Sequence, residues 1–224
     1  MKSTELIDLK ILSYRAAWEK QEFLLEKLKE EKRAGKTSIN YLLLVEHPHV
    51  YTLGRNGSKQ NLLIDTIQLK AKDAEFIQVD RGGDITYHGY GQLVAYPIIR
   101  LDAFEMGVKE YVFKLEEVII KTIANYNLKG ERLNGAIGVW LDADTKNARK
   151  ICAIGIRCSE FVTMHGFALN VNTNLNYFNY INPCGFVDKG VTSIEKELNY
   201  KVDFDEVKNL IIRNFEDVFG MDFI

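Results

Sequence analysis

A cysteine and a lysine carry the most chemistry that this sequence could offer. Cys184 lies in the run NPCGF, between a proline and a glycine, which favours a loop rather than a core. A thiolate is a good nucleophile when a neighbouring cation stabilises it. Lys150 opens the apolar run KICAIGIRC, where it could supply that cation or, when desolvated, act as a base. The alternative is a structural lysine that extends its ammonium group to solvent.

The other cysteines and two histidines are weaker candidates. Cys152 and Cys158 lie inside the apolar run, where small hydrophobic core residues are the simpler interpretation. His88 and His165 each precede a glycine, and either could pair with a cysteine or serve as a hydrogen-bonded structural residue. Strand alternation predicts one common face for Lys150, Cys152, Ile154, Ile156 and Cys158.

A glycine-rich segment, RGGDITYHGYGQLVAYPII over residues 81–99, is predicted to surround a ligand. Two glycines follow Arg81 and two more flank Tyr90, all beside polar side chains. Glycine adopts backbone angles that other residues avoid and lets the main chain approach a ligand closely. A plain turn would need only one or two glycines, so this loop is a candidate binding segment.

The elements that must position these residues follow from the hydrophobic pattern. Helical spacing predicts helices over residues 13–33 and 111–123, and a last helix that begins near Asp203, which forms a capping-box pattern with Glu206. Apolar runs predict strands over residues 41–46, 77–80, 92–99, 136–141, 151–157 and 167–171. Because the strands come in runs with helices between the groups, we expect an α+β fold with a mainly antiparallel sheet.

The composition argues against several classes of protein. A net charge of −2 and a pI of about 6.1 lack the basic excess of nucleic-acid-binding proteins. The three cysteines form neither a disulfide framework nor a zinc-binding pattern, so we expect no metal and a reducing, cytoplasmic setting. The charged start MKSTELIDLK is unlike a secretory signal, and no stretch approaches the ~20 apolar residues of a membrane helix.

Several motifs in a fixed order resemble one known family. EHPHVYTLGR, RGGDITYHGYGQLVAYPI, KICAIGI, TMHGFALNVN, PCG and VTS follow one another over roughly residues 41–198. Together they closely resemble the octanoyltransferase (LipB) family, the lipoyl(octanoyl) transferases of lipoate biosynthesis. No single motif is decisive, but their order leaves little room for coincidence.

This resemblance implies a fold, a reaction and its partners. The fold is that of the catalytic domains of lipoate and biotin protein ligases, a mixed, mainly antiparallel sheet flanked by helices, here as one domain over residues 1–224. The reaction transfers an octanoyl group from octanoyl-acyl carrier protein to a lysine of a lipoyl domain, without a cofactor. The acceptors are E2 subunits of 2-oxoacid dehydrogenases and the glycine cleavage H protein; neither nucleic acid nor a membrane takes part.

The resemblance also implies roles for individual residues. Cys184 carries the acyl group as a thioester, and Lys150 supports its thiolate. The substrate-binding segments of the family map onto Arg81, Gly82, Gly83, Asp84, Ile85, Thr86, Tyr87 and His88, onto Ala153, Ile154 and Gly155, and onto Gly166, Phe167 and Ala168.

The sequence departs from the family pattern at two positions, and rival functions stay open. The usual HGPGQ reads HGYGQ, with Tyr90 in place of proline, and the usual paired prolines after EH read Pro48-His49. Since proline fixes φ, we expect a more mobile loop at Tyr90. The alternatives are an ATP-dependent lipoate or biotin ligase-like enzyme, a non-catalytic module that binds lipoyl domains or acyl carriers, and a thiol hydrolase. The sequence contains neither a P-loop nor a GRGRxG run, which counts against the ligase.

Overall fold

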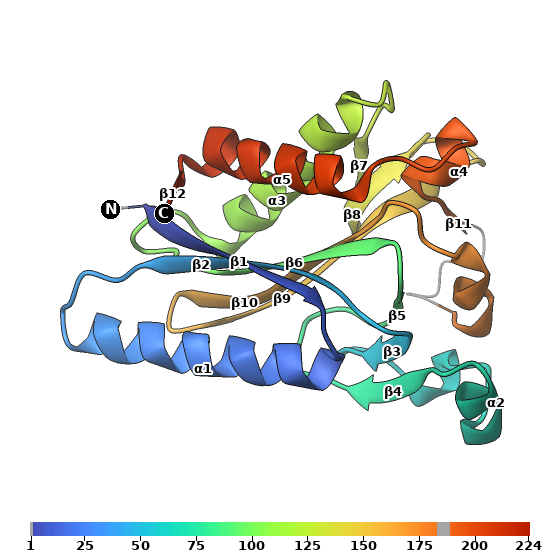
Figure 1. Ribbon diagram of the computed structural model, residues 1–224, viewed down its shortest axis with the longest axis horizontal. Helices are drawn as coiled ribbons and strands as arrows, with labels where there is room; N and C mark the ends of the chain where they lie inside the picture. The colour runs from blue at the N-terminus through green and yellow to red at the C-terminus, as the bar shows by residue number, and fades with distance from the viewer. Residues whose placement is uncertain (1, 183–188) are drawn as a thin grey trace.

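Two β-sheets and the helices around them form the protein. The structure, a computed structural model, describes residues 2–182 and 189–224 (Figure 1). Within these residues the larger sheet has the strand order β12-β1-β2-β6-β10-β9-β8-β7, with β11 beside β9. Its strands are β1 (Ser3–Ile11), β2 (Asn40–Glu46), β6 (Gln92–Ile98), β7 (Glu131–Leu133), β8 (Ala136–Leu141), β9 (Arg149–Ser159), β10 (Val162–Asn170), β11 (Gly190–Val191) and β12 (Asp222–Phe223).

The large sheet is mixed but mainly antiparallel. The β1–β2, β1–β12 and β9–β11 pairs are parallel, and the pairs from β2 to β7 are antiparallel. The smaller sheet has the order β4-β3-β5, from β3 (Val50–Leu53), β4 (Glu75–Gln78) and β5 (Ile85–His88). The predicted α+β class with a mixed, mainly antiparallel sheet is confirmed.

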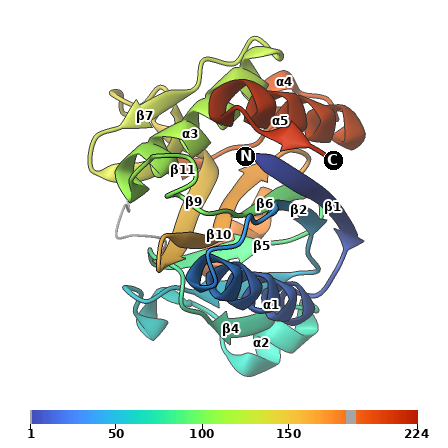
Figure 2. The same ribbon diagram turned by 90° about the vertical axis from the view of Figure 1, so that its left-hand side faces the viewer.

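Helices cover both faces of the large sheet. One face packs on α1 (Tyr14–Arg33), and the other on α3 (Val108–Ala124) and α5 (Phe204–Phe219), as Figures 1 and 2 show. The short helices are α2 (Thr66–Ala71), α4 (Ile194–Leu198) and the 3₁₀ turns η1 (Lys59–Asn61) and η2 (Leu175–Tyr180). The termini lie side by side because β12 pairs with β1 (Figure 2).

The predicted helices are confirmed with small changes at their ends. In α1, Ser13 caps the first turn and the predicted apolar stripe, including Ala17 and Leu28, is buried. In α5, the Asp203 carboxylate accepts hydrogen bonds from the N–H groups of Asp205 and Glu206 at 2.8 and 3.3 Å. Burial of one apolar stripe, more than intrinsic propensity, stabilises such helices.

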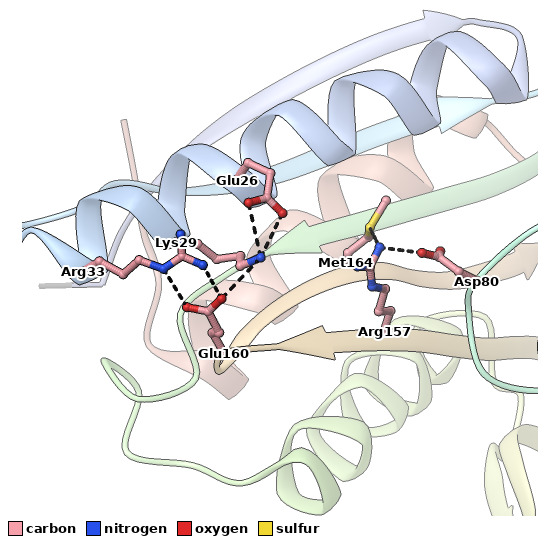
Figure 3. Close-up of polar contacts among 7 residues, drawn as sticks. All are labelled: Glu26, Lys29, Arg33, Asp80, Arg157, Glu160 and Met164. Atoms are coloured by element: carbon pink, nitrogen blue, oxygen red, sulfur yellow. Dashed lines mark hydrogen bonds and ion pairs between the residues drawn. The ribbon is translucent and has the colours of Figure 1, made fainter.

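An ion-pair cluster fixes α1 to the turn between β9 and β10 (Figure 3). The Arg33 Nε donates to Glu160 Oε2 at 3.0 Å, and the Lys29 Nζ lies 3.4 Å from Glu160 Oε1. The turn itself consists of Glu160 and Phe161, both with positive φ (52° and 66°), as a two-residue type I′ hairpin requires. Such turns usually contain Asn-Gly, which is absent here, so the sequence did not predict this hairpin. The strand β10 accordingly begins at Val162 and not at the predicted residue 167.

Other predicted strands differ at their ends, and some were missed. The strand expected over residues 77–80 lies at Glu75–Gln78, and β1, β3, β5, β7, β11 and β12 had no prediction. Several of these are short or half-exposed, so their apolar pattern is weak.

Candidate active site

One cavity collects nearly all the predicted site residues that the structure describes. It measures about 500 Å³, within the range of about 300–1,000 Å³ typical of small-molecule sites. It lies between the small sheet with its glycine loop and the β8–β9–β10 part of the large sheet. Its lining includes Arg81, Gly82, Gly83, Asp84, Ile85, Thr86 and His88, then Lys150, Ala153, Ile154 and Gly155, then Gly166, Phe167 and Ala168. Segments up to about 90 residues apart in the chain therefore meet around one space.

Tyr87 is the exception among these residues. It is fully buried and is absent from the cavity lining. Its hydroxyl is hydrogen-bonded to the His49 Nδ1 at 2.7 Å, and its ring stacks on Tyr177 with 4.9 Å between centroids. Alternation along β5 turns Tyr87 away from its neighbours Thr86 and His88. Tyr87 therefore fixes η2 rather than contacting a ligand.

The glycine loop lies directly on the large sheet. The Gly82 N–H donates to the Ile156 carbonyl at 2.9 Å, and a Cβ on Gly155 would come within 2.8 Å of the Gly82 oxygen. Gly83 has a φ of +85°, which only glycine adopts readily. Gly82 has no positive φ, so the backbone-angle argument applies to Gly83, whereas Gly82 makes the close backbone approach to β9. The Gly82 amide is thus occupied by the Ile156 carbonyl and does not point a free N–H into the cavity.

Arg81 ties the loop to the small sheet. It is 7% exposed, and its guanidinium donates to the Thr52 carbonyl at 2.7 Å, to the Thr52 Oγ1 at 2.9 Å and to the Gly82 carbonyl at 3.0 Å. A guanidinium stays charged and presents its donors in a fixed fork, which suits this arrangement. Arg81 therefore shapes the loop that the cavity needs.

A chain of buried hydrogen bonds continues from Thr52 across the floor of the cavity. His88 bridges two side chains: its Nε2 lies 3.3 Å from the Thr52 Oγ1, and its Nδ1 lies 2.8 Å from the Gln92 Oε1. The Gln92 Nε2 donates to Asn170 Oδ1 at 2.8 Å, and the Asn170 Nδ2 donates to the Thr192 carbonyl at 2.9 Å. We define these five residues, with Arg81, as the floor network.

Both candidate histidines are structural in this arrangement. Both ring nitrogens of His88 have partners, and burial lowers its pKa, helped by the nearby His47 and Arg81 charges. The His165 Nε2 lies 2.8 Å from Asp80 Oδ1, and burial lowers the His165 pKa although Asp80 opposes the shift. The structural interpretation of the two histidines is thus the one that their contacts favour.

Lys150 reaches the cavity because of a β-bulge. Trp140 pairs with Lys150 and Val139 pairs with Cys152, so β9 has one extra residue at this point. Val139 and Trp140 are adjacent and face opposite sides of the sheet, which places Lys150 opposite Cys152. The predicted common face is therefore wrong for Lys150, whose Nζ donates to the Ile137 carbonyl at 3.2 Å and lies 4.6 Å from the Trp140 ring.

The cysteines on β9 belong to the core, as predicted. Cys152 is fully buried and Cys158 is half-buried, both on the side of α3 and α5. Burial raises the pKa of each thiol, which disfavours the reactive thiolate. Neither sulfur is suited to nucleophilic chemistry.

Cys184 lies outside the described residues, but the chain on either side of it borders the cavity. Upstream, Phe178 of η2 lines the cavity, and the Asn182 N–H donates to the Asn61 carbonyl at 2.8 Å. Downstream, Lys189, Gly190 and Val191 line it as well. The Thr192 N–H donates to the Lys150 carbonyl at 2.9 Å, so the downstream anchor is beside Lys150 itself.

The sequence reasoning missed several residues of this site. Tyr14 stacks on His88 at 5.7 Å between ring centroids, and Tyr96 donates to the His47 Nε2 at 2.8 Å. Trp140 contacts Lys150. All three lie in apolar stripes where a core position was the simpler interpretation, so no local signal separated them from the core.

The described part of the chain lacks two other kinds of feature. No described helix is long and apolar enough to cross a membrane. Residues 2–182 and 189–224 also contain no group of three or more His, Cys, Asp or Glu side chains arranged to hold a metal ion.

Solved structures that share this architecture include lipoate and biotin ligases. An archaeal bi-partite lipoate protein ligase from Thermoplasma acidophilum superposes with a TM-score of 0.73 at 16% identity, over 100% of this chain and 86% of that one. A lipoate-protein ligase A bound with ATP superposes with a TM-score of 0.73 at 15% identity, over 99% of this chain and 87% of that one. Biotin protein ligase from Aquifex aeolicus superposes with a TM-score of 0.51 at 13% identity, over 98% of this chain and 70% of that one. These likenesses confirm the predicted ligase-like fold.

Sequence relatives are much closer. The model of the lipoyl protein ligase A/B catalytic domain matches residues 13–216. A Bacteroides thetaiotaomicron protein named octanoyltransferase is 54% identical over 205 residues, 92% of this chain and 90% of its own length. A Christiangramia forsetii protein of the same name is 49% identical over 225 residues, 97% and 96% of the two chains. The chain therefore belongs to the lipoyl protein ligase A/B catalytic domain family and, within it, to the octanoyltransferase (LipB) branch.

Proposed function

We propose that this enzyme transfers an octanoyl group from octanoyl-acyl carrier protein to a lysine of a lipoyl domain through a thioester on Cys184. The transferase class follows from relatives at about 50% identity over most of the chain. The observation that supports the route through Cys184 is the cavity itself. Lys150 and both flanks of the Cys184 segment line it together, whereas Cys152 and Cys158 are core residues with raised pKa values.

The first half-reaction acylates the enzyme. The Cys184 thiolate attacks the carbonyl carbon of the donor thioester, and a tetrahedral oxyanion forms. When it collapses, the bond from carbon to the phosphopantetheine sulfur breaks, and the leaving sulfur takes a proton from the Lys150 ammonium. Lys150 is thereby left as a neutral amine beside the acyl-enzyme, which is the state that a general base needs.

The second half-reaction forms the amide. The acceptor lysine attacks the Cys184 thioester as an amine, and its surplus proton passes to Lys150. The Cys184 sulfur leaves as the thiolate that began the cycle, so protons and charges balance over one turnover. Since amide formation from a thioester is downhill, this route needs no ATP, unlike a ligase that activates its acid as an adenylate.

The expected acceptors are lipoyl domains of 2-oxoacid dehydrogenase E2 subunits and the glycine cleavage H protein. The archaeal ligase of the same fold is described together with its E2 lipoyl domain, which supports this class of acceptor. We place the reaction in the cytoplasm, where the acyl carrier and the thiol-bearing enzyme would meet under reducing conditions.

Intact-mass measurement after incubation with octanoyl-acyl carrier protein tests the proposal. Wild type should gain one octanoyl group without ATP, and the Cys184→Ala variant should gain none. The Cys152→Ala and Cys158→Ala variants are matched controls that should still be acylated. Addition of a lipoyl domain should then move the octanoyl group onto it as a hydroxylamine-resistant amide. Acylation that persists in Cys184→Ala, or that requires ATP, would contradict the proposal.

A further inference from the structure

Trp140 lies against the side chain of Lys150 in the wall of the cavity. The Lys150 Nζ is 4.6 Å from the centre of the Trp140 ring, inside the distance of about 6 Å at which a cation interacts with an aromatic face. The face of an indole carries partial negative charge, and tryptophan attracts cations more strongly than tyrosine or phenylalanine does. Both residues line the cavity, so this contact lies at the site and not behind it.

The ring is held in place by its own contacts. Trp140 is only 2% exposed, and its Nε1 donates to the Ala136 carbonyl at 3.0 Å. The same strand β8 is fixed by the buried Glu116, whose Oε1 accepts from the Gly138 N–H at 3.1 Å. A side chain that contacts this ring therefore meets a rigid surface.

Gly138, beside the stem of Lys150, occupies a backbone position that suits only glycine. Gly138 has a φ of +123°, and a Cβ there would lie 2.5 Å from the Cys152 oxygen and 3.5 Å from the Lys150 Cε. The adjacent Ile137 carbonyl accepts from the Lys150 Nζ at 3.2 Å. The bulge, Gly138 and the indole thus act on the same side chain.

We infer that Trp140 is a positioning residue that holds the Lys150 side chain against β8 as an ammonium group directed into the cavity. This inference rests on the proposed role of Lys150 toward Cys184. A fixed ammonium favours the Cys184 thiolate, which the first half-reaction needs. The same contact does not favour the neutral amine that accepts a proton in the second. Loss of the ring should therefore slow acylation more than it slows amide formation.

The test measures Cys184 alkylation by iodoacetamide against pH, together with single-turnover rates of the two half-reactions. We compare wild type, Trp140→Phe and Trp140→Leu, locating the label by peptide mass. In Trp140→Leu the midpoint of the alkylation profile should move upward, and the rate at pH 7 should fall by about three- to tenfold, the range that a cation–π contact supports. Trp140→Phe keeps an aromatic face and should lie between Leu and wild type. If Trp140→Leu does not fold, the comparison of Trp140→Phe with wild type tests the inference.

Two further variants separate positioning from general disturbance. Phe161→Leu removes a similar contact, with the Lys32 Nζ 4.8 Å from the ring, on the turn between β9 and β10, and should leave the profile unchanged. The double variant Lys150→Met/Trp140→Leu should behave like Lys150→Met alone, because Trp140 acts through Lys150.

Two outcomes would overturn the inference. They differ in whether the proposed role of Lys150 is overturned as well. If both Trp140 variants keep the wild-type profile while Lys150→Met moves it, Trp140 is not the positioning residue and the proposed function stands. If Lys150→Met also leaves the profile unchanged, the proposed role of Lys150 falls, and the inference falls with it.

Discussion

The two sides of the cavity hold their cations in different ways. On the floor, the Arg81 guanidinium is buried and donates to the Thr52 and Gly82 carbonyls and to the Thr52 hydroxyl. Against β8, the Lys150 ammonium contacts the Ile137 carbonyl oxygen and the face of Trp140. Arginine stays protonated at any physiological pH, whereas lysine can exchange its proton. The comparison teaches that one charge organises the backbone and the other is placed where it can take part in chemistry.

This difference separates the expected effects of mutation. Changes to the floor network should lower stability, because they leave buried polar groups without partners. Changes at Lys150 should lower reactivity with little loss of stability, because few surface contacts contribute much to the free energy of unfolding.

The largest effect is expected for Lys150→Met, which removes the charge and roughly keeps the volume. Octanoyl transfer should fall by about 10²–10⁴-fold, the usual contribution of a general acid–base group, and the alkylation profile of Cys184 should move up toward an ordinary thiol value of about 8.5. Lys150→Arg should restore part of the thiol reactivity but little amide formation, because guanidinium does not accept a proton. If the free energy of unfolding of Lys150→Met also fell enough to account for the lost activity, the proposed difference between Lys150 and the floor network would be wrong.

His47, whose ring centroid lies 5.9 Å from that of His88 in the floor network, should make the stability depend on pH. Burial lowers the pKa of His47 to about 4, although the hydrogen bond from its ring to the Leu12 carbonyl opposes the shift. The unfolded chain takes up this proton near pH 6.5 and the folded chain does so only near pH 4. Protonation therefore favours unfolding: the stabilisation is complete above pH 6.5 and is lost as the pH falls toward 4. The difference between these two pKa values corresponds to about 3 kcal/mol.

Thermal melts of wild type and His47→Gln between pH 7 and pH 4 check this expectation. The variant lacks the titrating group, so its melting temperature should fall less over that window. Parallel curves for the two proteins would show that His47 is not neutral in the fold. His88, whose pKa burial also lowers, should add to the same slope in both.

The two glycines after Arg81 form a matched pair that tests where the loop is constrained. Gly83 has a φ of +85°, so Gly83→Ala should lose about 1–3 kcal/mol through backbone strain. At Gly82, among the described residues, a Cβ would meet the Ile156 oxygen at 3.4 Å and nothing nearer, so Gly82→Ala should lose less. We also expect Gly83→Val to lose acylation by much more than it loses stability, because the loop borders the cavity. Chemical denaturation beside acylation assays gives both quantities, and equal losses for the two alanine variants would refute this assignment.

The smallest effect is expected at Tyr90. The Gly89 carbonyl accepts from the Gln92 N–H at 3.1 Å and Gly91 has a φ of +77°, which together define a type II turn with Tyr90 at its second position. Proline is favoured at that position, so Tyr90→Pro should stabilise the protein by about 0.4–1 kcal/mol through the unfolded state. The lost edge contact between Tyr90 and His49, 5.1 Å between centroids, reduces this gain. A clear fall in melting temperature would show that the turn needs the tyrosine ring.

This turn also bears on the expectation of a looser loop at Tyr90. Within the described residues the Gly91 N–H donates to Glu46 Oε2 at 2.9 Å, and the Gly91 carbonyl accepts from the Asn172 N–H at 2.8 Å. A Cβ on Gly91 would lie 2.3 Å from the Asn172 oxygen. The glycines and their hydrogen bonds fix the turn without the proline, and melting of Tyr90→Pro beside wild type tests the expected mobility.

The sequence alone determined the fold class, the long elements and the order of the motifs. Apolar stripes of α1, α3 and α5 and the central strands β2, β6, β8 and β9 were predictable because a buried face imposes a strict period on the chain. The glycine loop was predictable as well, because residues of those types are rarely combined without a ligand.

Only the tertiary structure decided how these pieces meet. A single extra residue in β9 places the Lys150 side chain on the opposite face of the sheet from Cys152. No local sequence pattern predicted this bulge. The two-residue strand β11 and the Asn170–Thr192 hydrogen bond join segments that are distant in sequence. Trp140, Tyr14 and His47 gain their roles from neighbours that the fold supplies. Local periodicity records whether a residue is buried, whereas its partners depend on the packing of the whole chain.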